Sequence, residues 1–280
     1  MIIEAEQEVL SPSKNTIVGD PLCEDTQIIF QGKNNILFAE AGVRITGSRI
    51  VFAGDSAVLY LSQSHRVYRL TMDIYRETSV YIGSGNYFNG CLSAVISERQ
   101  NLIIGRGCIF SFGIWIRTAD PHLIYDADSH QRTNQSRSVF IGDHVWVGQN
   151  ALLLKGTRIG SGSILSAAAV AAGKQIGSNC IYAGNPARRI RDNIFWEGSC
   201  VHNYTREKTK ASLRYSRDDF LYADLSPLDM TAVGKELTEA PDAETRLSLL
   251  QKLAASGSEK NRFYLAPEPA PTFWQRLHRR

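Results

Sequence analysis

An aliphatic residue recurs at every sixth position through the middle of the chain, and this period constrains the fold more than any other feature. The recurring positions are Ile141, Val147, Leu153, Ile159, Leu165 and Ala171, followed after a shift of one residue by Ile176 and Ile181. A glycine or serine follows most of them. Neither a helix nor a strand period produces this spacing. It predicts an all-β solenoid, in which short strands form the sides of a triangular coil and aliphatic side chains fill its interior.

Weaker copies of the period lie earlier in the chain. They include Ile104, Phe110 and Ile116, and the stretches Ile82 to Phe88 and Leu37 to Val43. Three hexads complete one coil, so about 18 residues add one layer. The alanine-rich segment Ser166 to Ala172 has the propensity of a short helix, which is the alternative interpretation. Because the six-residue count runs unbroken into this segment, we predict another strand and corner there.

The pattern divides the chain into three segments. Residues 1–26 contain two prolines and no clear period, which indicates an irregular lead-in. The solenoid is expected over residues 27–186, interrupted by a polar loop over 122–137 that lacks the six-residue step. Loops that project from a regular scaffold often carry function. Residues 187–280 are expected to form a capping helix and a C-terminal extension, because a solenoid end needs a cap.

Two helices are predicted in this last segment. Residues 187–196 have the spacing of a short helix that would cap the coils after the turn Gly184-Asn185-Pro186. Residues 242–255 carry four leucines whose spacing indicates a helix that buries one face. The chain ends in a proline-rich stretch and a basic segment, residues 272–280. We interpret this end as a solvated tail; the alternative is docking on another subunit, an acidic polymer or a membrane surface.

The composition argues against several classes of function. The chain has 31 Lys and Arg against 28 Asp and Glu, a formal charge of +3, which is too balanced for a protein whose main partner is nucleic acid. The longest apolar stretch, Ile164 to Gly173, is shorter than the roughly 18 residues of a membrane span. The N-terminus is acidic and lacks the basic, apolar start of a signal peptide, so we expect a cytoplasmic protein.

Cysteines and short catalytic motifs narrow the chemistry further. The five cysteines are odd in number and far apart, so no disulfide framework or CxxC motif is available. We interpret them as small buried residues in a reducing compartment. Dinucleotide-binding, P-loop, serine-hydrolase and zincin motifs do not occur in the sequence. No metal is expected.

Four motifs carry a resemblance to a known family. They are Gly85-Asn86-Tyr87-Phe88-Asn89, Asp120-Pro121-His122, Ile141 to Gly148, and Ala183 to Arg188. In this order they resemble the hexapeptide-repeat acetyltransferases, well over residues 80–196 and in outline over 27–80. The spacing from His122 to Trp146 is most similar to bacterial capsule O-acetyltransferases, including the polysialic acid type. The resemblance implies a left-handed parallel β-helix, although the general crossover rule predicts the opposite hand. It also implies a homotrimer with sites between subunits.

The implied reaction moves an acetyl group from acetyl-CoA to a hydroxyl of a cell-surface polysaccharide, possible acceptors including polysialic acid. His122 matches the family's catalytic histidine. Histidine suits the step, because the attacking alcohol must lose its proton and imidazole is basic at cellular pH. A loop histidine bonded to backbone is the alternative. Asp120 or Asp126 could orient the His122 ring through its other nitrogen, as in catalytic triads, or could simply be solvated.

The resemblance also implies roles for other residues. Trp146 would lie in the active site beside the thioester of the donor, with interface packing as the alternative. The implied acceptor contacts are Asn86, Tyr87, Asn89 and Asp120; a corner role is the alternative for Asn86. His144 would be a coil-surface residue without a catalytic role, and His130 is ambiguous.

The resemblance implies a donor site formed by six residues. Gly148, Ala168 and Ala169 would let the pantetheine arm of coenzyme A lie against backbone. Lys174, Arg188 and Arg189 would bind its phosphates, although surface cations without a ligand are common.

Three other functions remain as alternatives. An acetyltransferase for a small sugar or antibiotic would have a closed lid over His122, whereas a polymer needs an open groove. A β-helix metalloenzyme of the carbonic anhydrase type would need three histidines at one metal, and His122, His130 and His144 are the available set. A non-catalytic solenoid scaffold would lose nothing on mutation of His122.

Overall fold

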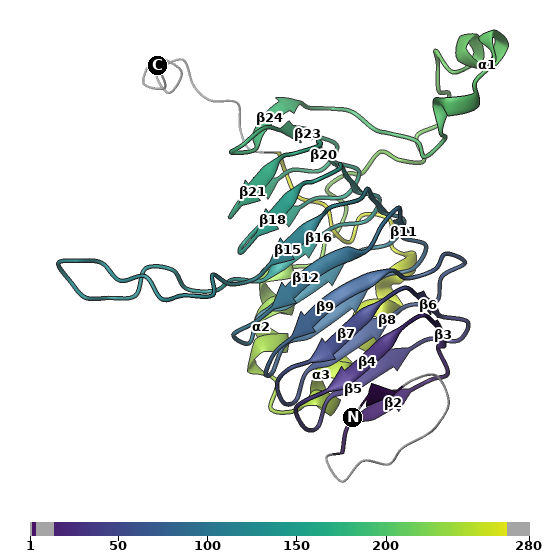
Figure 1. Cartoon of the computed structure of the whole chain (residues 1–280). Helices are drawn as coiled ribbons and strands as arrows, with labels where there is room; N and C mark the ends of the chain where they lie inside the picture. Colours follow the sequence, from purple (N-terminus) through teal and green to yellow (C-terminus); the bar gives the residue numbers. More distant parts are fainter. Residues whose placement is uncertain (1, 4–13, 268–280) are drawn as a thin grey trace.

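The computed structural model describes residues 2–3 and 14–267. Three sheets of mostly parallel strands form the sides of a solenoid (Figure 1). Sheet 1 has the order β1 (Ile2–Ile3), β4 (Gln27–Phe30), β7 (Arg49–Phe52), β9 (Leu70–Ile74), β12 (Leu92–Ile96), β15 (Trp115–Arg117), β18 (Leu152–Leu154) and β21 (Val170–Ala172). Sheet 2 has the order β2 (Thr16–Val18), β5 (Ile36–Ala39), β8 (Val58–Leu61), β10 (Ser79–Ile82), β13 (Asn101–Ile104), β16 (Val139–Ile141), β19 (Arg158–Ile159) and β22 (Gln175–Ile176).

The remaining elements complete the coils and the extension. Sheet 3 has the order β11 (Tyr87–Phe88), β14 (Ile109–Phe110), β17 (Trp146–Val147), β20 (Ile164–Leu165), β23 (Ile181–Ala183) and β24 (Arg188–Arg191), and β3 (Leu22–Glu24) pairs with β6 (Arg44–Thr46). The helical elements are η1 (Val201–Asn203), α1 (Arg206–Ala211), α2 (Met230–Glu239), α3 (Ala243–Ala255) and η2 (Ser256–Ser258). No helix in the described part of the chain is long and apolar enough to span a bilayer.

The six-residue period is confirmed as the core of the solenoid. The side chains of Ile141, Val147, Leu153, Ile159, Leu165, Ala171 and Ile176 are at most 1% exposed and belong to one continuous apolar cluster. The earlier copies of the period are buried in the same cluster. The alanine-rich segment is also confirmed as a corner and a strand: Ala168 occupies the corner with φ +56°, and β21 follows it.

Three predictions at the ends of the coils were wrong. Parallel pairing begins at Thr16, where β2 pairs with β5, and not at residue 27. The core position that ends the period is Tyr182, 3% exposed, and not Ile181, which is half-buried. Residues 187–196 form no helix: β24 turns back antiparallel against β23 and so covers the edge of sheet 3. Pairing on an open strand edge satisfies backbone groups that a helix placed there would leave exposed.

The C-terminal extension returns along the outer face of sheet 2. The helix predicted at 242–255 is confirmed as α3, with the Asp242 side chain capping its first turn. Helix α2, which was not predicted, packs beside it on the same sheet. A second apolar cluster fills this interface: Ile36, Val58, Tyr60, Tyr81, Ile103 and Phe140 from sheet 2 meet Met230, Leu237, Ala243, Leu250, Leu253 and Phe263 from the extension. Burial of each such large side chain contributes about 1.5–3 kcal/mol.

A buried ion pair joins the end of the extension to the solenoid. Arg262 donates from Nε and Nη2 to the two carboxylate oxygens of Asp143, at 3.1 and 3.0 Å. Both side chains are at most 1% exposed. Arg262 also donates to the carbonyl of Leu253 at the end of α3. One side chain therefore ties the helix to a corner of the coils.

The predictions for the cysteines and for the basic tail have different outcomes. Only Cys108 and Cys180 are buried; Cys23 and Cys91 are half-buried and Cys200 is exposed, so the prediction that all cysteines are buried was wrong. The predicted basic tail, residues 272–280, lies outside the described residues.

Candidate active site

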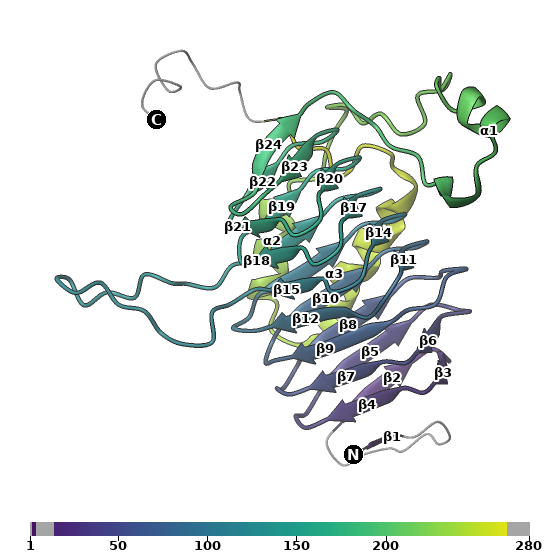
Figure 2. The same cartoon turned by 45° about the horizontal axis from the view of Figure 1, so that its top comes forward.

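An arm of residues 119–137 leaves the solenoid at the corner between sheets 1 and 2. It connects β15 to β16 and projects far beyond the coils, as Figures 1 and 2 both show. Its two sides pair as an antiparallel ribbon through a bridge between Tyr125 and Arg132. The predicted interruption at 122–137 is therefore confirmed as a projecting loop. Hydrogen bonds within the loop hold its conformation.

Asn134 anchors the base of this arm. Its side chain is 6% exposed. Its Nδ2 donates to the backbone carbonyl of His122 at 2.7 Å and to Asp120 at 3.2 Å, and its Oδ1 accepts from the backbone N–H of Ile124 at 2.9 Å. One buried amide thus holds the main chain at His122 and Ile124 and the side chain of Asp120. A second clamp joins Arg132 to Glu98 on the body of the solenoid through two hydrogen bonds.

His122 presents an exposed side chain on this anchored main chain. Among residues 2–3 and 14–267, no group forms a hydrogen bond with the His122 ring. Neither carboxylate considered for orienting the ring contacts it. Asp120 accepts from Lys155 Nζ at 2.6 Å, and this hydrogen bond holds the pKa of Asp120 below its usual range. Asp126 accepts from Ser129 and Asp128 within the arm.

His144 and Trp146 occupy adjoining positions with different surroundings. The His144 ring is stacked between Trp196 at 3.8 Å and Phe220 at 4.3 Å, and its Nε2 lies 2.9 Å from the carbonyl of Trp196. Burial lowers the pKa of His144. Its surface is therefore covered by the C-terminal segment. Trp146 is 41% exposed on the outer face of sheet 3.

Tyr87 lies in the same column of sheet 3 as Trp146. Register pairs Tyr87 with Ile109, and Ile109 with Trp146, so the two aromatic residues are two strands, about 10 Å, apart. Tyr87 is 39% exposed, and its hydroxyl donates to Asn89 at 3.3 Å. Asn89 is also exposed. The outer face of sheet 3 therefore carries two exposed aromatic side chains, Tyr87 and Trp146, with Ile109 between them.

Asn86 has the corner role and cannot contact an acceptor. It is 1% exposed. Its Nδ2 donates to the carbonyls of Gly83 and Gly105, both at 2.9 Å, and its Oδ1 accepts from Cys108 N–H at 2.7 Å. Its amide closes the corner at Gly83 and joins this coil to the next one at Gly105 and Cys108, so the expectation of an acceptor contact is corrected.

The three small residues expected under the pantetheine arm serve different purposes. Ala169 is fully buried in the core and faces no ligand. Gly148 is required by coil stacking, because a β carbon there would lie 2.4 Å from the backbone nitrogen of Ala167. Ala168 alone is exposed, at its corner. For Gly148 and Ala169 the repeat itself explains the small side chain.

The three cations expected at the donor phosphates lie at two separate places, one at a corner and one on a strand. Lys174 follows β21 at the corner between sheets 1 and 2, on the side of the arm. Arg188 and Arg189 lie on β24 in sheet 3, where Arg189 is 3.6 Å from Asp192. Within one chain these cations do not form a single cluster.

Comparison with known proteins shows which enzymes this chain is similar to. No family model matches it. It is 29% identical over 183 residues to the polysialic acid O-acetyltransferase of Neisseria meningitidis, a match that covers 65% of this chain and 84% of that protein. It is 32% identical over 102 residues to a polysialic acid O-acetyltransferase of Escherichia coli O1:K1, a match that spans only 33% of that protein. The crystal structure of a polysialic acid O-acetyltransferase superposes with a TM-score of 0.63 and 27% identity, covering 70% of this chain and 94% of that one.

The sequence and the fold of this chain are similar to those of the hexapeptide-repeat O-acetyltransferases. In the part of this acetyltransferase that the structure describes, no group of three His, Cys, Asp or Glu side chains could hold a metal ion. The ring of His144 lies between two aromatic rings. His122, His130 and His144 therefore do not converge as the metalloenzyme alternative requires.

Several residues that shape the acetyltransferase site were not found from the sequence. Asn134 and Lys155 hold the arm around His122. Trp196 and Phe220 cover His144 beside Trp146. No short motif marks them, because each acts through a contact with a residue distant in the chain. The polar composition of the arm was the one available signal for Asn134.

Proposed function

We propose that the acetyltransferase moves the acetyl group of acetyl-CoA to a hydroxyl of a cell-surface polysaccharide, with His122 as general base. Polysialic acid is the first candidate acceptor, since relatives that act on it cover most of the solenoid. The observation that carries the proposal is the arm, which presents the His122 ring to solvent on a main chain held by the buried side chain of Asn134.

The proposed reaction needs one proton to move twice. The His122 ring takes the proton of the acceptor hydroxyl as its oxygen attacks the thioester carbonyl. The tetrahedral intermediate then breaks the carbon–sulfur bond. Coenzyme A leaves as a thiolate and receives the proton from the imidazolium. No segment among residues 14–267 covers His122, which is exposed, and such an open site suits a polymer chain better than a small molecule.

We also propose that the site is shared between subunits of a homotrimer. His122 leaves the corner between sheets 1 and 2, whereas Trp146 and Tyr87 lie on sheet 3. Sheet 2 is covered by α2 and α3, so sheets 1 and 3 are the faces available for a second chain. The exposed residues Leu123, Ile124 and Tyr125 of the arm give it an apolar surface for such a contact.

The acceptor is identified by the release of coenzyme A from acetyl-CoA in the presence of different sugars. We expect release with polysialic acid or another capsular polysaccharide, and none above the hydrolysis rate with free sugars or chloramphenicol. The measurement follows the free thiol and, by mass spectrometry, the acetylated product. Release with small sugars or antibiotics alone would replace the polymer by the small-molecule alternative. No release with any acceptor would contradict the transferase proposal.

Replacement of Asn134 by alanine is expected to lower kcat/KM by about 10- to 100-fold while the solenoid stays folded. Three hydrogen bonds that hold residues 120–124 would be lost, and displacement of a catalytic group by about 1 Å can cost 100-fold. Gln135→Ala is the matched control, since Gln135 is the exposed neighbour. Equal activity of the two variants would show that the anchor does not position His122.

A further inference from the structure

Residues 198–217, here called the basic segment, include η1 and α1 and stand clear of the coils, as Figures 1 and 2 both show. The segment contains five Lys and Arg residues and one Glu. The five are Arg206, Lys208, Lys210, Arg214 and Arg217. The formal charge of the whole chain is only +3, so this short segment carries more net positive charge than the entire protein.

Most of these cations have no partner in the described part of the chain. Arg217 pairs with Asp219 at 3.1 Å. The side chains of the other four form no ion pair or hydrogen bond with residues 2–3 and 14–267. All residues over 205–214 are exposed. Arg206 and Lys210 are four positions apart and therefore share one face of α1. The basic segment thus presents charges that the protein itself does not neutralise.

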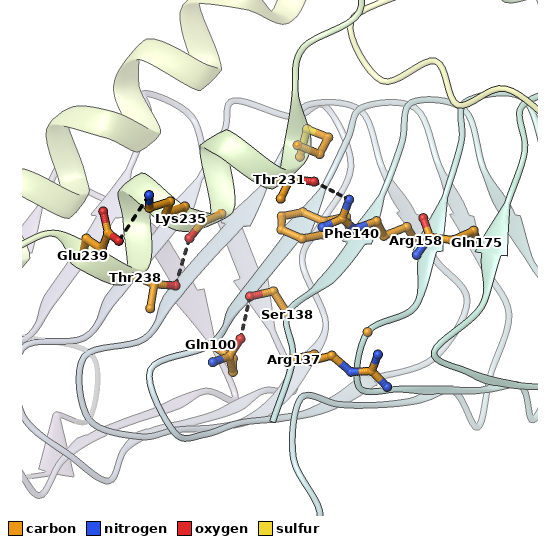
Figure 3. A pocket seen from close by; sticks show the side chains of 13 residues that line it. Gln100, Arg137, Ser138, Phe140, Arg158, Gln175, Thr231, Lys235, Thr238 and Glu239 are labelled. Atoms are coloured by element: carbon orange, nitrogen blue, oxygen red, sulfur yellow. Dashed lines mark hydrogen bonds and ion pairs between the residues drawn. The ribbon is translucent and has the colours of Figure 1, made fainter. Parts of the chain in front are cut away.

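Two cations at helix α2 show the contrast (Figure 3). There Arg158 donates to Thr231 Oγ1 at 2.8 Å, and Lys235 lies 3.8 Å from Glu239. The extension therefore supplies partners for these two cations, whereas it leaves those of α1 to solvent or to a ligand.

A series of aromatic rings joins the base of the basic segment to Trp146. The ring of Tyr215, which belongs to the segment, lies 6.0 Å from the ring of Phe220. Phe220 stacks on His144 at 4.3 Å, and His144 stacks on Trp196 at 3.8 Å. The rings of Trp196 and Trp146 are 6.0 Å apart. These contacts anchor the basic segment beside the exposed tryptophan of the candidate active site.

We propose that the basic segment binds an acidic acceptor polymer at sugars beyond the one that receives the acetyl group, and this inference rests on the proposed function. A polysaccharide with a carboxylate on each sugar offers a row of anions, which Lys and Arg bind through charge-assisted hydrogen bonds. Cations spread along an exposed segment suit such a row, because they need not meet at one anion. Their attraction also raises the rate at which a charged polymer reaches the site.

The test measures binding of the full-length protein, without acetyl-CoA, to three immobilised polysaccharides by biolayer interferometry. Polysialic acid and hyaluronate carry carboxylates, and dextran is neutral. We expect binding to the two acidic polymers that weakens as salt is added, and none to dextran. The triple variant Lys208→Ala, Lys210→Ala, Arg214→Ala should bind the acidic polymers about 10-fold more weakly, since each exposed ion pair contributes a small share.

A second triple variant, Lys14→Ala, Lys33→Ala, Lys252→Ala, is the matched control. It removes the same charge from exposed lysines outside the basic segment and should keep the original affinity. Thermal unfolding should be the same in both variants, because every substituted side chain is exposed. In an active enzyme, the variant of the basic segment should raise the KM for an acidic polymer about 10-fold and leave kcat unchanged.

The outcomes separate this inference from the proposed function. Loss of affinity in the variant of the basic segment alone would support the inference even if no polymer is acetylated. Equal affinity of the two variants, or no binding to either acidic polymer, would overturn it even if acetylation occurs.

Two further results would assign the basic segment to another partner and overturn the inference. Leu213 is 77% exposed, and cations beside an apolar side chain also suit a lipid surface. Binding to phosphatidylglycerol vesicles without binding to the acidic polymers would indicate that surface. A change of oligomeric state in the variant of the basic segment, measured by light scattering, would indicate a contact between subunits.

Discussion

Replacement of His122 by alanine is expected to lower kcat/KM for acetyl transfer by about 10²- to 10⁴-fold, the usual contribution of a general base. The reason is the proton on the acceptor hydroxyl, since a neutral alcohol attacks a thioester slowly. The arm supplies no substitute near this position. The two carboxylates closest in sequence, Asp120 and Asp126, are already bonded to Lys155 and to Ser129.

The experiment measures initial rates of coenzyme A release with the polymer acceptor at varied concentrations. His130→Ala is the matched control, because His130 is an exposed histidine at the tip of the same arm and should retain wild-type rates. Added imidazole should restore part of the activity of His122→Ala, since it can enter an exposed site and accept the proton. Wild-type kinetics in His122→Ala would eliminate the general-base role of His122.

Replacement of Arg262 by alanine is expected to lower the free energy of unfolding by about 3–5 kcal/mol, the usual effect of removing one partner of a buried ion pair. Asp143 would keep its place at a corner of the coils with 1% exposure. Its nearest remaining cation, Arg106, is 3.8 Å away and partly exposed. Arg262 also bonds to the end of α3, so the extension should loosen first.

Chemical denaturation monitored by circular dichroism measures this effect, and limited proteolysis reports where the chain opens. Arg214→Ala is the matched control, because Arg214 is an exposed arginine of the same extension and should change stability by no more than about 0.5 kcal/mol. Asp143→Asn should fall between the two, since an amide keeps some hydrogen bonds without the charge. Equal stability of Arg262→Ala and Arg214→Ala would contradict the role of the buried pair.

The helix prediction at 187–196 shows where local sequence reasoning failed. The residue types there permit a helix, but β23 presents an unpaired edge and β24 pairs with it. Asn86 shows the same limit at the site. Its motif predicted a contact with the acceptor, whereas its amide forms hydrogen bonds between successive coils. In both cases a neighbour distant in sequence decided the outcome.

The sequence by itself determined the solenoid, the position of the projecting loop and the helix at 242–255. Short stretches of sequence indicate these features. Core residues of the coils recur about every six positions, and the loop is the segment in which this period stops. The tertiary structure alone decided how the extension folds back over sheet 2, how Arg262 pairs with Asp143, and how Asn134 holds the chain at His122. Asn134 and His122 are 12 positions apart and Arg262 and Asp143 are 119 apart, and no period in the sequence indicates which partners will meet.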